Sequence, residues 1–457
     1  MRPNLNNTRP FVAHSLVRPP NGTATVRERR TSAIFTRASA LLILAAALTP
    51  AQPQPLTLQQ AEAIAIKNHP QIQAAQNELN FAQQQVTINR APYYPNISGE
   101  ITGSQANANG RIGAGDLQAS RVFNRFGQGA VLSQLVTDSG RTPSLVASAR
   151  LQAQATGQNL TATRYTVILD VNRAYFDVLH AQAVIKVAQQ TVSARQLLSD
   201  QVTELAKNSL KSQLDVSFAD VNVSEAKLLL IRAEEAVQSA QAELGQALGS
   251  DQPADYQLVE DQLPPGPPGK ADDLVTQALA NRPELASLKF SRDSAYKFFD
   301  AERDLSRPTV SIAAVGGFLP YINATVPAEY ESIGANLSIP IFNGHLFSAR
   351  REAAHQKALE SDQHLRDQQE HIARDVRVAW AGAFTAFQRI DVTAQFVRQA
   401  ALALDLAQGR YNLGLSSIVE LTQAQLNLTQ AEIENLSAKY DYETQYSALQ
   451  YTIGALR

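Results

Sequence analysis

The amino-acid sequence predicts a mostly helical protein made of two tandem structural repeats, each with long antiparallel coiled-coil helices and two β-strands. Three observations support this prediction. A helix–turn–helix pattern occurs twice, apolar residues recur every seven positions along the longest helical stretches, and four short segments alternate apolar with polar residues. The first observation indicates a duplication, the second coiled coils and the third strands.

Two turns define the duplication. Residues 207–215 (KNSLKSQLD) and 411–420 (YNLGLSSIVE) each interrupt a long helical pattern, which then restarts at a serine. Serine is a favoured N-cap, and an acidic residue suits the first turn of a helix. The two turns align at four pairs of positions: Leu210 with Leu415, Ser212 with Ser417, Leu214 with Val419, and Asp215 with Glu420.

The first repeat is expected over residues 52–249. It opens with a helix that is interrupted at His69–Pro70, because a proline disfavours the helical conformation of the residue before it. Strands are then expected at about 94–104 and 126–137, and long helices at about 143–206 and 212–249.

The second repeat is expected over residues 271–457 and has the same order of elements. Its strands are expected at about 308–318 and 331–341, and its long helices at about 345–410 and 416–454. Between the repeats, residues 250–270 contain five prolines, which predict a Pro-rich linker over the outer surface of the helices.

The long helices carry a heptad pattern with a branched apolar residue in one row and mostly alanine in the other. Val216, Val223 and Leu230, for example, are each followed three residues later by an alanine. This pattern is typical of coiled-coil seams packed at a short distance. An antiparallel hairpin satisfies the pattern as well as a ring of hairpins does; a second apolar row, such as Leu160 and Val167, favours the ring.

The predicted strands have one apolar face and the length of a tilted membrane-spanning strand. In the last of them, Ile333, Ala335 and Leu337 alternate with polar or small residues. An open sheet edge is not tolerated in lipid, so four strands that span a membrane have to be completed by other chains, and three chains give an allowed twelve. A small soluble sheet with one buried face fits the same alternation.

The N-terminal region has the features of an export signal. Residues 38–48 form a short apolar run that follows Arg29, Arg30 and Arg37 and precedes a small-residue exit. We expect a secretory signal peptide over residues 1–51, the alternative being a buried helix of the fold. No later stretch is apolar over 18 residues, so the sequence predicts an exported chain without a transmembrane helix.

Composition excludes several classes of function. The chain has 457 residues, a net charge of −2 and no cysteine. The charge gives no indication of a nucleic-acid partner, and without cysteine there is no disulfide framework, zinc–thiolate site or thiol nucleophile. His355, His364 and His371 lack the i, i+4 spacing of a helical metal site. With no phosphate loop or catalytic set, we expect no cofactor, no metal and no enzymatic activity.

Three motifs carry a family resemblance. Residues 341–345 (IFNGH) and 136–140 (VTDSG) resemble a strand-to-helix junction, and residues 408–420 followed by Gln423 resemble a hairpin-tip signature. Together with the duplicated order of elements, they make the chain similar to the TolC-like outer membrane efflux protein family from about Leu56 to the C-terminus.

The resemblance implies a homotrimer that forms a 12-stranded β-barrel in the cell outer membrane, in contact with its lipid, and an α-helical tunnel in the periplasm. It implies the exit duct of a tripartite efflux or type I secretion system, which conducts substrate passively and catalyses nothing. The implied partners are a periplasmic adaptor (membrane fusion) protein and an inner-membrane efflux pump or ABC exporter.

The resemblance also implies a gate at the periplasmic helix–turn–helix tips. Its implied residues are Glu420, which matches an acidic ring, Gln423, and a hydroxyl–carboxylate pair of Tyr411 with Asp215. Ser416 stands where an arginine ties neighbouring hairpins, so we expect a mouth that is held shut loosely. The positions implied to contact the adaptor are Ser209, Leu210, Lys211, Ser212, Gly414, Leu415, Ser416 and Ser417.

Two other interpretations stay open at this point. Glu420 and Asp215 each fall in the first turn of a helix, where an acid simply favours the helix dipole. For the whole chain, the alternative is an exported periplasmic coiled-coil scaffold with no channel activity.

Overall fold

The computed structural model describes residues 55–105, 125–250, 256–322 and 327–456. The expected signal peptide lies outside the described residues. The helices are α1 (Leu58–Asn68), α2 (Pro70–Arg90), α3 (Arg141–Lys207), α4 (Gln213–Ala247), α5 (Ala271–Asn281), α6 (Pro283–Asp304), α7 (Leu346–Asn412) and α8 (Ile418–Thr452), with a 3₁₀ turn, η1, at Ala91–Tyr93. The strands are β1 (Pro55–Leu56), β2 (Asn96–Ser104), β3 (Arg125–Thr137), β4 (Gln257–Leu258), β5 (Thr309–Ile322) and β6 (Glu329–Ser338).

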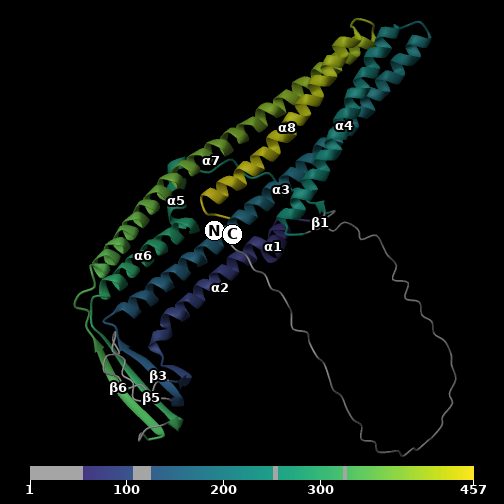
Figure 1. Cartoon of the computed structure of the whole chain (residues 1–457). Coiled ribbons are helices and arrows are strands. Elements are labelled where there is room, and N and C mark those ends of the chain that lie inside the picture. The colour runs from purple at the N-terminus through teal and green to yellow at the C-terminus, as the bar shows by residue number, and fades with distance from the viewer. Residues whose placement is uncertain (1–54, 106–124, 251–255, 323–326, 457) are drawn as a thin grey trace, which may run out of the picture. The chain divides into compact units, whose positions relative to one another are not determined.

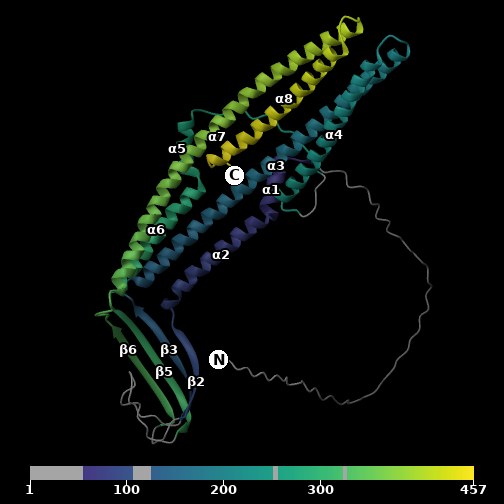
Figure 2. The ribbon, with the colours of Figure 1, turned by 45° about the horizontal axis from the view of Figure 1, so that its top comes forward.

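The predicted mostly helical fold with two similar halves is confirmed. Each half contains a 67-residue helix, α3 or α7, and a 35-residue helix, α4 or α8, that returns beside it. The two hairpins run side by side, and the shorter helices α2 and α6 lie along the other end of α3 (Figures 1 and 2). None of the described helices combines the length and the apolarity needed to cross a membrane.

The helix boundaries follow from local chemistry. Thr57 and Gln60 form a capping box at α1, and Ser212 and Asp215 form another at α4. Pro70 is the first residue of α2, where a backbone N–H would have no carbonyl partner within the helix, so a proline is tolerated there. Pro283 does the same for α6 in the second half, which explains why both halves begin with a short helix and a break.

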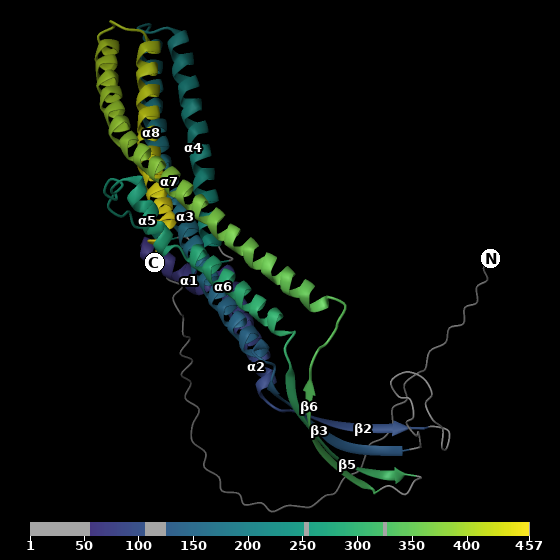
Figure 3. The same cartoon turned by 90° about the vertical axis from the view of Figure 1, so that its left-hand side faces the viewer.

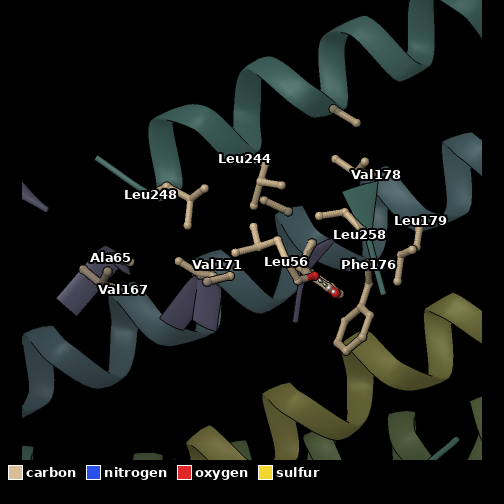
Figure 4. Packing of buried hydrophobic residues seen from close by; sticks show 14 of the residues in the cluster. Leu56, Ala65, Val167, Val171, Phe176, Val178, Leu179, Leu244, Leu248 and Leu258 are labelled. Atoms are coloured by element: carbon tan, nitrogen blue, oxygen red, sulfur yellow. Dashed lines mark hydrogen bonds between the residues drawn. The ribbon is translucent and has the colours of Figure 1, made fainter. Parts of the chain in front are cut away.

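The core consists of the predicted heptad seams. Alanines of α4 that lie seven residues apart, Ala219, Ala226, Ala233 and Ala240, are all buried. Figure 4 shows the largest cluster, in which Val171 and Val178 of α3 face Leu244 and Leu248 of α4. Leu56 and Leu258, from the paired strands β1 and β4, fill the space between these helices.

The second sheet joins the two halves. Its order is β2–β3–β5–β6, all antiparallel, and β3 of the first half pairs with β5 of the second. The sheet lies beyond the ends of α2, α3, α6 and α7, away from the two helical turns (Figure 3). Strands β2 and β6 form its edges, and within the described residues each has a partner on one side only.

The ends of two strands differ from the expected ones. The alternation continues to Ile341, but β6 ends at Ser338, because Pro340 has no N–H to donate to a ladder. Strand β5 extends to Ile322, beyond the expected end at 318, and its ladder with β3 continues to the pair Arg125–Ile322. Gly316 and Gly317 interrupt the alternation of apolar and polar side chains in the sequence, but the strand continues through them.

Candidate functional site

The two turns at 208–212 and 413–417 lie at the same end of the helices (Figure 1). They have the same backbone geometry. Leu210 N–H donates to Leu205 O at 2.9 Å, and Leu415 N–H donates to Arg410 O at 2.8 Å. The preceding residue is left-handed in both, with φ of 59° at Ser209 and 71° at Gly414. Glycine adopts this conformation without strain, whereas serine does so at a cost.

Tyr411 connects the two turns. Its side chain is 5% exposed and packs with Val202 and Val216 of the first hairpin and Leu421 of the second. The Lys211 ammonium lies 4.0 Å from the centre of the Tyr411 ring. A cation over an aromatic face is attracted by the ring quadrupole, so this contact holds the turn of one hairpin against the other.

The hydroxyl–carboxylate pair of Tyr411 and Asp215 is not hydrogen-bonded within the described chain. Tyr411 Oη is buried without a hydrogen-bond partner. Asp215 Oδ2 instead accepts from Ser212 N–H at 3.0 Å and from Ser212 Oγ–H at 2.9 Å, as the capping box requires. Burial, and then the nearby charge of Asp215, raise the pKa of Tyr411.

Glu420 has a partner that the sequence reasoning missed. Arg410 Nε lies 3.1 Å from Glu420 Oε1, and Arg410 Nη2–H donates to Leu415 O at 3.4 Å. Arg410 and Glu420 are equally far in sequence from Leu415, the centre of an antiparallel hairpin, and this symmetry is the signal that could have revealed the pair. Both side chains are about half exposed, so the pairing is weak but reduces the charge that Glu420 presents.

The remaining predicted gate residues lie apart from these contacts. Gln423 is exposed, and its Nε2–H donates to Asn427 Oδ1 at 2.9 Å along α8. Ser416 Oγ is buried and, within the described chain, makes no hydrogen bond. The structure therefore brings Lys211 to Tyr411 and Arg410 to Glu420, and it leaves Gln423 and Ser416 outside both pairs.

The tips expose apolar side chains at matching positions. Leu210 and Leu415 are 68% and 66% exposed, and Leu214 and Val419, at the next matching pair, are 65% and 55% exposed. An apolar patch of this kind, rimmed by polar residues, is typical of a protein–protein interaction site.

No described residues form a metal centre, since no group of three or more His, Cys, Asp or Glu side chains comes together among them. His364 Nε2 lies 3.3 Å from Glu360, and His371 Nε2 lies 3.4 Å from Asp367, each one turn earlier on α7. These are surface pairs along one helix.

Comparison with known proteins identifies the family. The family model "Outer membrane efflux protein" matches residues 63–250 and 274–455. The outer membrane efflux protein BepC of Brucella suis is 24% identical over 415 residues, covering 88% of this chain and 86% of its own. The outer membrane protein TolC of Salmonella enteritidis is 23% identical over 419 residues, covering 88% and 83%.

A solved structure has the same fold. The CmeC outer membrane channel of Campylobacter jejuni superposes with a TM-score of 0.75 at 18% identity, covering 87% of this chain and 85% of that one. The family model spans most of both repeats, which contain the paired hairpins and the four-stranded sheet. The chain therefore belongs to the outer membrane efflux protein family, and it is an outer-membrane efflux channel and not an enzyme.

Proposed function

We propose that this channel works as a homotrimer that forms the exit duct of a tripartite efflux or type I secretion system. It receives substrate from a periplasmic adaptor and an inner-membrane pump or ABC exporter, and a gate at the hairpin tips controls its inner mouth. The observation that carries the proposal is the four-stranded sheet, whose two edges have no partner among the described residues, joined to two parallel hairpins that end in matching turns.

The sheet supports the trimer. One face carries Ile97, Leu132, Ile312 and Ile333, whereas the other carries Ser98, Ser133 and Ser332. Unpaired edges are not stable in lipid, so edge β6 of one chain pairs with edge β2 of the next. Three chains then give a closed sheet of twelve strands with its apolar face outward.

The helices support the same assembly. On α4, Val221, Leu228 and Ile231 are 56%, 55% and 59% exposed, and on α7, Val392 and Leu406 are 64% and 60% exposed. Residues 221 and 228 lie seven apart, and 392 and 406 lie fourteen apart, so each set forms a heptad seam that no described residue covers. A neighbouring subunit covers these seams and turns the hairpins into a ring.

The tip contacts support the gate. Lys211 over Tyr411 ties the two hairpins of one chain together, and Arg410 with Glu420 ties α7 to α8 within the second hairpin. Each contact is worth about 0.5–1 kcal/mol at an exposed site, so a few per trimer hold a mouth that opens reversibly. Tyr411 Oη and Ser416 Oγ are buried without a hydrogen-bond partner among the described residues, so neither hydroxyl adds to these two contacts.

Three measurements test the proposal. Membranes of cells that make the full chain are fractionated, and the purified protein is run on gels with and without heating and then added to planar bilayers. We expect a detergent-extracted outer-membrane species, a heat-sensitive trimer and stepwise ion conductance. A soluble periplasmic species without conductance would support the coiled-coil scaffold and refute the duct.

The adaptor contact is tested by photo-crosslinking in cells. A photoreactive residue at Leu415 is expected to capture the adaptor, because Leu415 is exposed at the tip. The matched control is Phe81 on α2, which is 64% exposed but lies far from the tips along the helices. Equal capture at both positions would count against docking at the tips.

A further inference from the structure

A hollow of about 300 Å³ lies on the polar face of the four-stranded sheet. Its wall is formed by Glu100 and Thr102 of β2, Val131 of β3, Val315 and Leu319 of β5, and Tyr330 of β6. This volume is at the lower end of the range of small-molecule sites in proteins. All four strands contribute to one concave surface.

Glycines form the floor of this hollow. The register of the sheet pairs Glu100 with Gly129, Gly129 with Gly317, and Gly317 with Tyr330. These four residues therefore lie in one row on one face. A Cβ placed on Gly129 or on Gly317 would lie 2.5 Å from Tyr330 Oη. The phenol therefore packs over both glycines and reaches the residue that is paired with Glu100, a packing that a side chain at either position would prevent.

The apolar wall opposite the phenol is built in the same way. A Cβ placed on Gly127 would lie 2.7 Å from Leu319 Cδ2, so Leu319 lies over this glycine as Tyr330 lies over the other two. Val131 and Val315, both half-buried, are paired with each other two residues beyond the Gly129–Gly317 row, on the side away from Gly127, so the phenol lies between them and Leu319. The hollow thus has aliphatic side chains on either side of the phenol and a glycine floor.

The described residues of the hollow carry one negative charge, that of Glu100. Glu100 is exposed, and no ion pair or hydrogen bond to its side chain is formed within the described residues. Among the described residues that line the hollow there is no lysine, arginine or histidine. A carboxylate beside an aromatic ring attracts a cation, and the aliphatic side accommodates an apolar group attached to it.

We propose that this hollow is a binding subsite for amphipathic organic monocations, such as protonated or quaternary amines with an aryl or alkyl group. The inference rests on the proposed function, since the polar face has to line the conduit for substrate to meet it. The cationic centre lies between the Glu100 carboxylate and the Tyr330 ring, and the apolar group lies against Leu319.

The test uses benzyltrimethylammonium, whose charge does not depend on pH, and benzenesulfonate, an anion of similar size. Binding to the full-length trimer in detergent is measured by isothermal titration calorimetry, and block of the K⁺ current is measured in planar bilayers. We expect benzyltrimethylammonium to bind and to block, and benzenesulfonate to do neither. Equal affinity for the two probes would overturn the proposal.

A substitution that removes the charge of Glu100 tests whether its carboxylate binds the cation. Glu100→Gln is expected to weaken benzyltrimethylammonium binding about tenfold, which corresponds to the loss of one charged contact. The matched control is Glu331→Gln, because Glu331 is paired with Gly316 and lies on the opposite face of the sheet. Unchanged affinity in Glu100→Gln, or the same loss in both variants, would overturn the proposal.

Substitutions of Tyr330 and Gly129 test the roles of the aromatic ring and of the glycine floor beneath it. Tyr330→Phe is expected to retain binding and Tyr330→Leu to weaken it about fivefold. Gly129→Ala is expected to weaken binding by displacing the phenol, whereas Gly334→Ala, where a Cβ meets nothing within 4 Å, is expected to leave binding unchanged. Equal effects of the two alanine variants would contradict the predicted geometry.

The two readouts separate this proposal from the proposed function. Calorimetry does not require a conducting pore, so a trimer that binds the cation but never conducts contradicts the duct and not the subsite. A trimer that conducts, but has the same affinity for the cation in the wild type and in Glu100→Gln, contradicts the subsite and not the duct.

Discussion

The Lys211 ammonium lies 4.0 Å from the centre of the Tyr411 ring, so one side chain from the first turn is held on a buried aromatic of the second hairpin. Because this contact joins the two hairpins of a chain, we expect it to stabilise the closed mouth. Lys211→Met keeps the aliphatic stem and removes the charge, and it should increase open-channel occupancy in planar bilayers about 10- to 100-fold, from three contacts of about 0.5–1 kcal/mol each.

The matched control for this prediction is Lys207→Met. Lys207 is four residues earlier and pairs with Glu204 on its own helix at 2.7 Å, so it carries the same charge but touches no second hairpin. Tyr411→Phe should change the conductance little, because Tyr411 Oη has no hydrogen-bond partner within the described chain. An equal increase in both lysine variants would show that net charge at the tip, and not the ring contact, controls opening.

The Arg410–Glu420 pair predicts a change in ion selectivity. Glu420 by itself would favour cations at the mouth, and Arg410, 3.1 Å away, offsets that charge. Arg410→Gln should therefore increase the permeability ratio of K⁺ to Cl⁻, and Glu420→Gln should decrease it. Reversal potentials in a KCl gradient measure both, with Arg398→Gln, an exposed arginine earlier on the same helix, as the control. Selectivity that does not change in Arg410→Gln would mean that the pair lies away from the ion path.

Much of the fold was predictable because it is encoded in periodicity. The heptads of α3 and α4 bury Val171, Val178 and Ala219 as expected, and the predicted family, efflux-channel function and outer-membrane location are confirmed. The predicted end of β6, at about residue 341, was wrong because the alternation of side chains continues past the point where Pro340 ends the backbone ladder. Side-chain alternation and the hydrogen-bonding capacity of the backbone are separate signals, and at Pro340 they disagree.

The contacts between segments far apart in the sequence were not predictable in the same way. Strand β1 pairs with β4 about two hundred residues later in sequence, and two-residue strands have no periodicity to detect. Lys211 over Tyr411 likewise depends on how two hairpins pack, which neither turn encodes by itself. Arg410 with Glu420 is local and could have been predicted from the symmetry of the hairpin. The gate and adaptor assignments of the tip residues stay predictions.

The Tyr175 hydroxyl holds the linker against helix α3. This hydroxyl lies 2.8 Å from Leu56 O and 2.7 Å from Val259 O, and it accepts Val259 N–H at 3.1 Å, so it joins α3 to both β1 and the linker. Tyr175→Phe removes these hydrogen bonds, although Val259 N–H still donates to Leu56 O at 3.1 Å, and it should destabilise the fold by about 0.5–1.5 kcal/mol. Denaturant unfolding measures the loss, and proteolysis within residues 256–270 should become faster. Tyr446→Phe, which removes a hydroxyl without a hydrogen bond in the described chain, should have no effect; equal loss in both would refute the role of Tyr175.

Glu443 on α8 makes stability depend on pH. The side chain is 3% exposed, and burial raises its pKa to about 7, with Lys439 opposing the shift and Glu260 and Asp261 adding to it. Because the folded chain holds this proton more tightly than the unfolded one, the contribution of Glu443 to stability is full below the unfolded pKa, near 4.5, and is lost as the pH rises through about 7.

Glu443→Gln removes this loss. Its stability advantage over the wild type should grow by about 2 kcal/mol per chain between pH 5 and pH 8, measured by denaturant unfolding of the helices. The control is Glu434→Gln, at a half-exposed position on the same helix, for which the advantage should not grow with pH. If the two variants show the same pH dependence, the buried carboxyl of Glu443 is not its source.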